Sequence, residues 1–254
     1  MSAGRQFGGA LDYAQGALRV RLAYNSKNTD VAATGVNHDL GRNVLLGANY
    51  DLKWIKLGKA TSAEIKALAD TLKAADILSV KTTDPADASY TKIPFSGKTN
   101  WIKIAPGMEK AAAFLETHRY AAFKGGSLGF TKMEGTTVNA KDKIAYSAMS
   151  RIESSMVDGT VAGMKVTANS AGAVYQLHLK AGQVDTNGQA IDSEWVPVDM
   201  AAVAELVGAP ISPADELGNT HNADKISNPD NLKFSEKLRT LFVGEDSGGH
   251  VNNF

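Results

Sequence analysis

The sequence predicts a mainly β protein, an antiparallel barrel, sandwich or propeller, with inserted α-helices. Short runs in which apolar and polar residues alternate recur along most of the chain, and Gly, Asn and Asp separate them. Two longer stretches instead repeat their apolar residues at helical spacing. No exact repeat at a fixed period is present, so the pattern leaves the three β architectures open.

The first part of the chain is expected to form strands. Residues 18–24 (LRVRLAY) alternate and predict a half-buried strand. Residues 25–43 are polar and contain Gly, which is typical of a loop, and residues 43–57 predict a strand pair (NVLLGANY and LKWIKLG).

Three helices are predicted. In residues 61–78 the apolar residues fall on one face, and Thr61 and Glu64 fit a capping box. Residues 107–123 are rich in Ala, Leu, Glu and Met, which are strong helix formers. A short third helix is expected over residues 200–207, capped by Asp199 and stopped by the following Gly-Ala-Pro.

The remaining pattern is that of short strands. They are expected at residues 129–133, 143–149, 173–179 and 195–198, and in a last hairpin formed by 232–234 and 241–243. The second arm of this hairpin is an apolar run ending in Gly, which is typical of a buried strand.

The composition excludes several classes of protein. The 254 residues include 27 Lys+Arg and 27 Asp+Glu, so nothing in the charge indicates nucleic acid or an anionic membrane surface as a partner. The absence of Cys excludes disulfides, zinc–thiolate sites and thiol nucleophiles. Residues 1–9 lack the apolar stretch expected of a signal peptide, as would a chain whose signal had been removed, and no apolar run is long enough to span a membrane. The chain stops soon after its last predicted strand, which favours a fragment of a longer chain.

Oxygen-bearing side chains are expected where predicted strands meet turns. Glu134 and Glu245 follow strands, Asp246 comes next, and Asp230 and Asn231 open a strand within the turn Asn-Pro-Asp-Asn. Hard cations such as calcium bind several such oxygens at close range. Carboxylates brought together repel one another unless a cation lies between them, so either these groups do not converge or they hold a metal.

Basic residues near these positions suit an anionic substrate. The candidates are Arg119 and Lys124 near the second helix, Lys132 beside Glu134, and Arg151 after a strand end. The five histidines form no HxH or HExxH pattern, and no G-x-S-x-G, Walker or G-x-G-x-x-G motif occurs in a supporting context.

Eight segments occur in an order that resembles the PhoX-type alkaline phosphatases. They are 101–104 (WIKI), 114–122 (FLETHRYAA), 132–135 (KMEG), 145–150 (AYSAMS), 172–175 (GAVY), 195–199 (WVPVD), 228–231 (NPDN) and 244–246 (GED). The resemblance covers residues 101–254, and residues 1–60 match nothing in it.

The resemblance implies a β-propeller with inserted helices and an exported enzyme, periplasmic or extracellular, that hydrolyses small phosphate monoesters with iron and calcium. Matched by motif, Glu134 and Glu245 are expected as metal ligands, with Asp230, Asn231 and Asp246 as ligands or their supports. Arg119 is expected to hold the phosphate.

This chain departs from the family in length and in its cysteines. Residues 1–254 would form one propeller-type domain with helical insertions at 61–78 and 107–123. Blades of about 40–45 residues allow only about five or six, so an incomplete propeller is expected. The family's iron site includes a thiolate, and some relatives carry Cys near Ala171 and His221, so calcium is favoured over iron. The alternatives are a non-catalytic calcium-binding propeller fragment and a calcium-dependent lactonase-like hydrolase.

Overall fold

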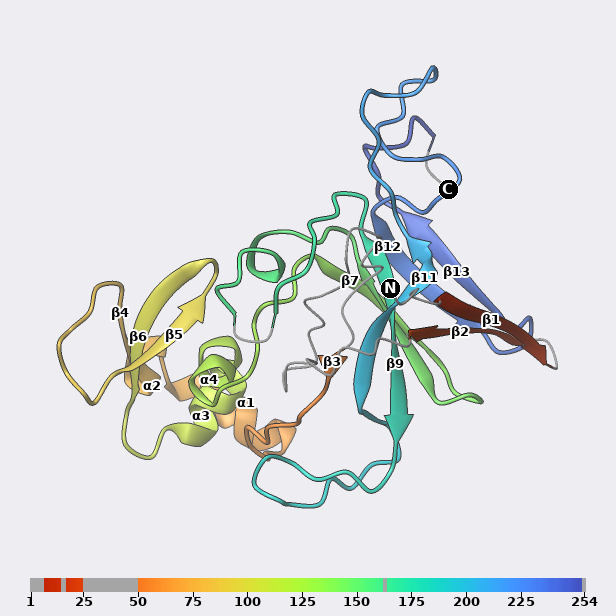
Figure 1. The fold of residues 1–254 in the computed structure, drawn as a ribbon. Coiled ribbons are helices and arrows are strands. Elements are labelled where there is room, and N and C mark those ends of the chain that lie inside the picture. The colour runs from red at the N-terminus through yellow and green to blue at the C-terminus, as the bar shows by residue number, and fades with distance from the viewer. Residues whose placement is uncertain (1–6, 15–16, 25–49, 162–163, 253–254) are drawn as a thin grey trace, which may run out of the picture. The chain divides into compact units, whose positions relative to one another are not determined.

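The computed structural model describes residues 7–14, 17–24, 50–161 and 164–252, with side chains described from residue 50 onward. Strands β1 (Phe7–Ala14) and β2 (Ala17–Tyr24) form an antiparallel hairpin, which confirms the strand predicted at 18–24. The loop predicted at 25–43 and the first arm of the strand pair lie outside the described residues. From residue 50 the chain divides into two compact units (Figure 1).

Unit 1 combines residues up to 52 with 131–183 and 191–254. One antiparallel sheet has the strand order β3-β11-β9-β8-β7, with β10 paired to β9, and a second is the hairpin β12-β13. The strands of unit 1 are β3 (Tyr50–Asp51), β7 (Met133–Asn139), β8 (Ile144–Met149), β9 (Ala173–Lys180), β10 (Val196–Pro197), β11 (Asp199–Val207), β12 (Pro229–Ser235) and β13 (Thr240–Glu245). A 3-10 turn, η1 (Ser154–Met156), follows β8.

The hairpin β12-β13 packs onto the larger sheet of unit 1. Leu232 of β12 is buried with Ala148 of β8 and Val174 of β9. Gly135 of β7 lies so close to β12 that a Cβ added there would be 2.3 Å from the carbonyl oxygen of Asp230. Only glycine therefore permits this approach of the two strands.

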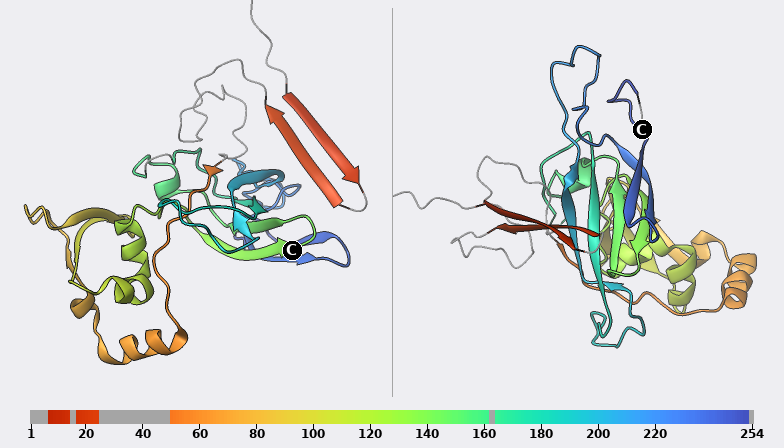
Figure 2. Two further views of the ribbon diagram at one scale, coloured as in Figure 1. Left: turned by 90° about the horizontal axis from the view of Figure 1, so that it is seen from below. Right: turned by 90° about the vertical axis from the view of Figure 1, so that its right-hand side faces the viewer.

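Unit 2 consists of residues 53–130 with 184–190. A three-stranded antiparallel sheet, in the order β4-β6-β5, packs against two helices. Its elements are α1 (Ser62–Thr71), α2 (Ala74–Ile77), β4 (Leu78–Lys81), β5 (Thr91–Phe95), β6 (Lys98–Ile104), α3 (Glu109–Leu115) and α4 (Thr117–Phe123). Both views of Figure 2 show α3 and α4 beside this sheet.

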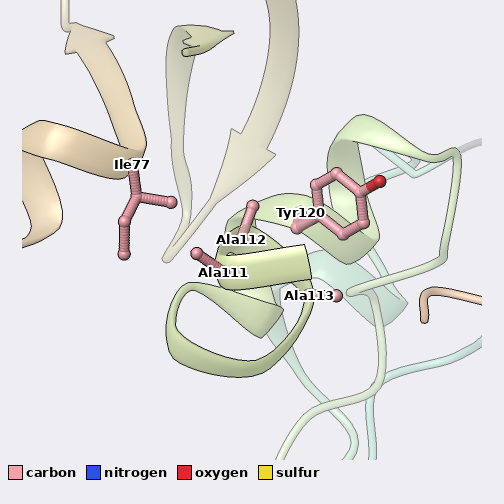
Figure 3. Packing of buried hydrophobic residues seen from close by; sticks show 5 residues of the cluster. All are labelled: Ile77, Ala111, Ala112, Ala113 and Tyr120. Atoms are coloured by element: carbon pink, nitrogen blue, oxygen red, sulfur yellow. The ribbon is translucent and has the colours of Figure 1, made fainter. Parts of the chain in front are cut away.

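The core of unit 2 is built mainly from small residues of its helices. Ile77 packs with the three consecutive alanines of α3 and with Tyr120 of α4, as Figure 3 shows. A second cluster joins Ile93 and Ile102 of the sheet to α4. Ile104 and Phe123 pack against both clusters, which connects the apolar interior of the sheet with that of the helices.

The predicted strands of the second half are largely confirmed. Strands β9, β12 and β13 contain the segments expected at 173–179, 232–234 and 241–243. β8 covers 144–149 of the segment expected at 143–149, and β10 covers only 196–197 of the segment expected at 195–198. The last hairpin pairs Leu232 with Val243 and Phe234 with Leu241. The expectation of a buried second arm was wrong, because β13 is only half-buried and Phe242 is 51% exposed.

The helix predicted at 200–207 was wrong. These residues form β11, which pairs with β9 through Ala201↔Gln176 and Ala202↔Tyr175. Asp199, the expected helix cap, instead accepts a hydrogen bond from the backbone N–H of His178 at 3.0 Å and contacts its ring. Alanine-rich sequence favours a helix only weakly, and pairing within a sheet overrides that preference.

The two other predicted helices exist but are shorter or divided. The capping box of Thr61 and Glu64 is present, yet α1 ends at Thr71 and the segment continues through α2 into β4. The stretch 107–123 is divided into α3 and α4 at Glu116, which has the non-helical angles φ −127° and ψ 36°.

Two predicted strands were misplaced. Residues 52–58 form no strand beyond an isolated bridge between Trp54 and Asp185. Residues 129–132 are irregular, and β7 begins at Met133, so Glu134 opens a strand instead of following one.

The mainly β character is confirmed, but the propeller stays a prediction. Within the described ranges, no sheet closes into a barrel and no propeller is formed. None of the helices there has the length and apolar character needed to cross a bilayer.

Candidate functional site

Several strand ends of unit 1 meet at one edge, which we call the rim. β7 begins where β8 ends and β9 begins, because Met133 pairs with Met149 and Met149 pairs with Ala173. β12 begins where β13 ends, because Pro229 pairs with Glu245. Since β12 packs along β7, both groups of strand ends lie together (Figure 1).

Asn228 ties the two groups of strand ends to each other. It is 2% exposed and has a φ of +46°, a conformation that Asn tolerates better than most residues. Its Nδ2 donates to the carbonyl oxygens of Ser150, at 2.8 Å, and Ser170, at 2.7 Å. Its backbone N–H donates to the carbonyl oxygen of Ala171 at 2.8 Å. The amide side chain therefore crosslinks the ends of β8, β9 and β12.

Glu134, a predicted metal ligand, lies at the rim in an ion pair. Its Oε1 is 2.9 Å from Nζ of Lys132, and the Glu134 side chain is 31% exposed. The hydrogen bond with Glu134 and the charge of its carboxylate raise the pKa of Lys132. Asp230 adds to that rise, whereas the positive charge of Arg151 opposes it. Glu134, Asp230 and Arg151 are therefore all close enough to act on the charge of Lys132.

Glu245, the second predicted ligand, forms a buried pair with His250. Its Oε1 accepts the backbone N–H of Ser227 at 2.7 Å, and its Oε2 is 2.9 Å from Nδ1 of His250. The other ring nitrogen of His250 is 3.1 Å from the carbonyl oxygen of Asn222. Both ring nitrogens thus face acceptors, an arrangement that is fully satisfied only by the doubly protonated imidazolium.

The other predicted ligands lie near the same edge but are more open. Asp230 is half-buried, whereas Asn231 and Asp246 are exposed. The backbone N–H of Asp246 donates to the carbonyl oxygen of Asn228 at 3.1 Å, which fixes the chain just past β13. The side-chain roles proposed for these three residues stay predictions.

As these side chains lie, they do not fit a calcium or iron ion. Glu134 is engaged with Lys132, and Glu245 is engaged with His250 and a backbone N–H. Nowhere in the described part of the chain do three or more His, Asp or Glu side chains form a group that could hold a metal. A hard cation needs several oxygens directed at one point.

Arg119, the predicted phosphate-binding residue, belongs to α4 of unit 2. Its Nη1 donates to Oε2 of Glu116 at 2.8 Å, and its guanidinium lies 4.1 Å from the ring centre of Phe95. The side chain is 26% exposed. These contacts give Arg119 a packing role within unit 2, and its part in binding phosphate stays a prediction.

A cluster of hydroxyl and imidazole groups at the rim was missed by the sequence analysis. Nε2 of His221 is 3.3 Å from Oγ of Ser170, and Nδ1 is 2.5 Å from Oγ of Ser227. Ser227 also contacts Oγ of Ser247, which lies 3.2 Å from Oδ1 of Asn228. We call these five residues the rim cluster.

The rim cluster has a closely fitted support. His221 is 7% exposed and its backbone N–H donates to the carbonyl oxygen of Gly249 at 3.1 Å. A Cβ at Gly249 would lie 2.1 Å from Nδ1 of His221, so only glycine allows the loop to pass the ring. Burial lowers the pKa of His221, and the positive charges of His250 and Arg151 lower it further, against an opposing effect of Glu245. The ring is therefore neutral at pH 7.

Comparison of the chain with protein-family models, with curated proteins and with solved structures found no match. The assignment of a function consequently depends on the residues of the rim.

Proposed function

We propose that the chain hydrolyses phosphate monoesters at the rim of unit 1. The observation that carries the proposal is the exposed guanidinium of Arg151, whose positive charge acts on His221 of the rim cluster. The resemblance to PhoX-type phosphatases supports the same substrate class and supports an exported location.

An isolated backbone bridge brings the chain at Arg151 close to the chain at Ser170. Ile152 and Asn169 exchange both backbone hydrogen bonds, at 3.0 and 2.9 Å. Arg151 precedes this bridge and Ser170 follows it, in the turn that the bond from the backbone N–H of Gly172 to the carbonyl oxygen of Asn169 closes. A group bound by Arg151 would therefore lie near Ser170.

Arg151 suits a phosphate because its charge is not neutralised by a neighbour. Within residues 50–161 and 164–252, its guanidinium has neither an ion pair nor a hydrogen bond. The planar guanidinium can bind two phosphate oxygens at once, and Lys132 supplies a second positive charge close by.

A direct test is the release of nitrophenol from p-nitrophenyl phosphate. Arg151→Gln should lower kcat/KM by about tenfold to a hundredfold, since a hydrogen bond to a charged group contributes about 1.5–3 kcal/mol. Arg151→Lys should retain part of the activity because it keeps the charge without the paired donors. Lys180→Gln is the matched control, since Lys180 is exposed at the opposite end of β9.

The predicted metals are tested separately, by elemental analysis of the purified protein. Bound calcium that is lost in Glu134→Gln and Glu245→Gln would support the family's ligand assignment. The same assay of turnover, with and without added calcium or iron, then shows whether activity depends on them. Turnover of a lactone but not of the phosphate ester would favour the lactonase alternative, and no turnover under any condition would favour the binding module.

A further inference from the structure

We propose that Ser170 is a nucleophilic serine and that His221 is its general base. The inference takes its substrate class from the proposed function, but its nucleophile comes from the geometry of the rim cluster alone. No local sequence motif marks the pair, since the two residues are 51 positions apart. What identifies them is a network of hydrogen bonds that fixes the direction of the bond between His221 and Ser227.

The side chain of Asn228 sets this direction. Its Nδ2 donates both hydrogens, to the carbonyl oxygens of Ser150 and Ser170, so its Oδ1 is left as an acceptor. Oγ of Ser247, at 3.2 Å, and Oγ of Ser227, at 3.5 Å, can both donate to that Oδ1. These two hydroxyls also contact each other, so their two hydrogens are used in that contact and at Oδ1.

The position of the hydrogen on the His221 ring follows from this assignment. Neither hydroxyl hydrogen is left for Nδ1 of His221, so His221 must supply the hydrogen between Nδ1 and Oγ of Ser227. A neutral imidazole protonated on Nδ1 carries its lone pair on Nε2. That lone pair faces Oγ of Ser170 at 3.3 Å, where it accepts the hydroxyl hydrogen.

The surroundings keep His221 able to act as a base. The ring is buried, and the imidazolium of His250 lies with its ring centre 6.4 Å away in an edge-on arrangement. A second positive charge so close disfavours protonation of His221. Ser170, by contrast, is exposed, so a substrate can reach its hydroxyl while the base stays shielded from water.

On a phosphate monoester the reaction has two balanced steps. Oγ of Ser170 attacks phosphorus, the bond from phosphorus to the ester oxygen breaks, and the serine proton passes to Nε2 of His221 and then to the departing alcohol. Water next attacks the phosphoserine, gives a proton to Nε2, and the Oγ–phosphorus bond breaks as Ser170 recovers that proton. The products are the alcohol and inorganic phosphate, and Arg151 holds the phosphoryl oxygens in both steps.

The experiment is labelling of the full chain with diisopropyl fluorophosphate, followed by mass spectrometry of the peptides. The adduct forms as the Oγ–phosphorus bond replaces the phosphorus–fluorine bond and fluoride leaves. We expect one adduct, on Ser170, with none in Ser170→Ala. Labelling should be at least a hundredfold slower in His221→Gln. Ser193→Ala is the control, since Ser193 is exposed in unit 1 and its Oγ only accepts a backbone N–H.

The outcomes separate this inference from the proposed function. Labelling of Ser170 in a protein that does not hydrolyse p-nitrophenyl phosphate would support Ser170 as the nucleophile and contradict the proposed phosphatase function. Full hydrolysis of p-nitrophenyl phosphate by Ser170→Ala would support the phosphatase function and overturn the role of Ser170 as nucleophile. An unlabelled wild-type protein, or equal labelling in His221→Gln with an unchanged melting temperature, would also overturn it.

Discussion

Removing the charge of Glu245 should destabilise unit 1 strongly. Glu245→Gln keeps the shape of the side chain but leaves the His250 imidazolium without its counter-charge. The side chains of the pair are only 6% and 3% exposed, and their polar atoms are 2.9 Å apart. Breaking a buried ion pair by removing one partner costs about 3–5 kcal/mol. A domain of this size is stable by only about 5–15 kcal/mol, so the loss is a large fraction of the total.

An exposed pair in the same unit provides the matched control. Nδ1 of His178 is 2.7 Å from Oδ1 of Asp199, but these side chains are 46% and 41% exposed. Asp199→Asn should therefore cost less than about 1 kcal/mol, because water screens the charges. A third variant, Glu245→Gln with His250→Gln, removes both buried charges and should recover part of the stability lost in the single variant.

The assay is urea unfolding monitored so that the two units are distinguished. Trp195 lies in unit 1, whereas Trp54 and Trp101 lie in unit 2. Replacing the latter two with Phe makes tryptophan fluorescence a reporter of unit 1, which matters because two units need not unfold in one step. Equal losses in Glu245→Gln and Asp199→Asn would refute the reasoning, since burial would then not decide the cost.

Three further predictions concern the base, its support and the core of unit 2. Gly249→Ala should displace the ring of His221 and slow fluorophosphonate labelling at least tenfold, whereas Gly248→Ala, whose added Cβ would meet nothing within 4 Å, should leave the rate unchanged. The labelling rate should hold at pH 6.5 and fall only at lower pH, because the pKa of His221 is lowered and labelling requires its neutral form; half-maximal labelling at or above pH 6.5 would contradict this. Ile102→Ala should lower the free energy of unfolding by about 2–5 kcal/mol, measured by urea denaturation of unit 2, whereas Val80→Ala, at 36% exposure, should change it by about 0.5 kcal/mol or less.

Local features were predictable from the sequence where neighbouring residues determine them. The capping box at Thr61 is confirmed because its partners are three positions apart. The last hairpin was found because alternation along a strand reflects one buried face. The helix expected at 200–207 failed because the partner of β11 is β9, more than twenty positions away, and no local pattern shows that pairing.

The candidate site was predictable only in part. The sequence left open whether Glu134, Asp230 and Glu245 converge, and in the structure the strand ends that carry them meet at the rim. The rim cluster was missed because Ser170, His221 and their supporting residues are brought together only by the fold. The partner of Glu245 was missed for the same reason, since the loop after β13 must turn back before His250 reaches it.

The division into two units has a consequence for the order in which the chain folds during synthesis. The buried apolar residues of the two core clusters of unit 2 lie between Ile77 and Ala122, so this core is complete in sequence before most of the strands of unit 1 have been made. Unit 1 is completed later, because β3 at Tyr50 pairs with Met200 of β11, which is made much later. The hydrogen bonds that Asn228 makes at the rim can form only after that. On a ribosome, unit 2 can therefore fold first. The preceding strand β3 then stays unpaired until β11 has been synthesised.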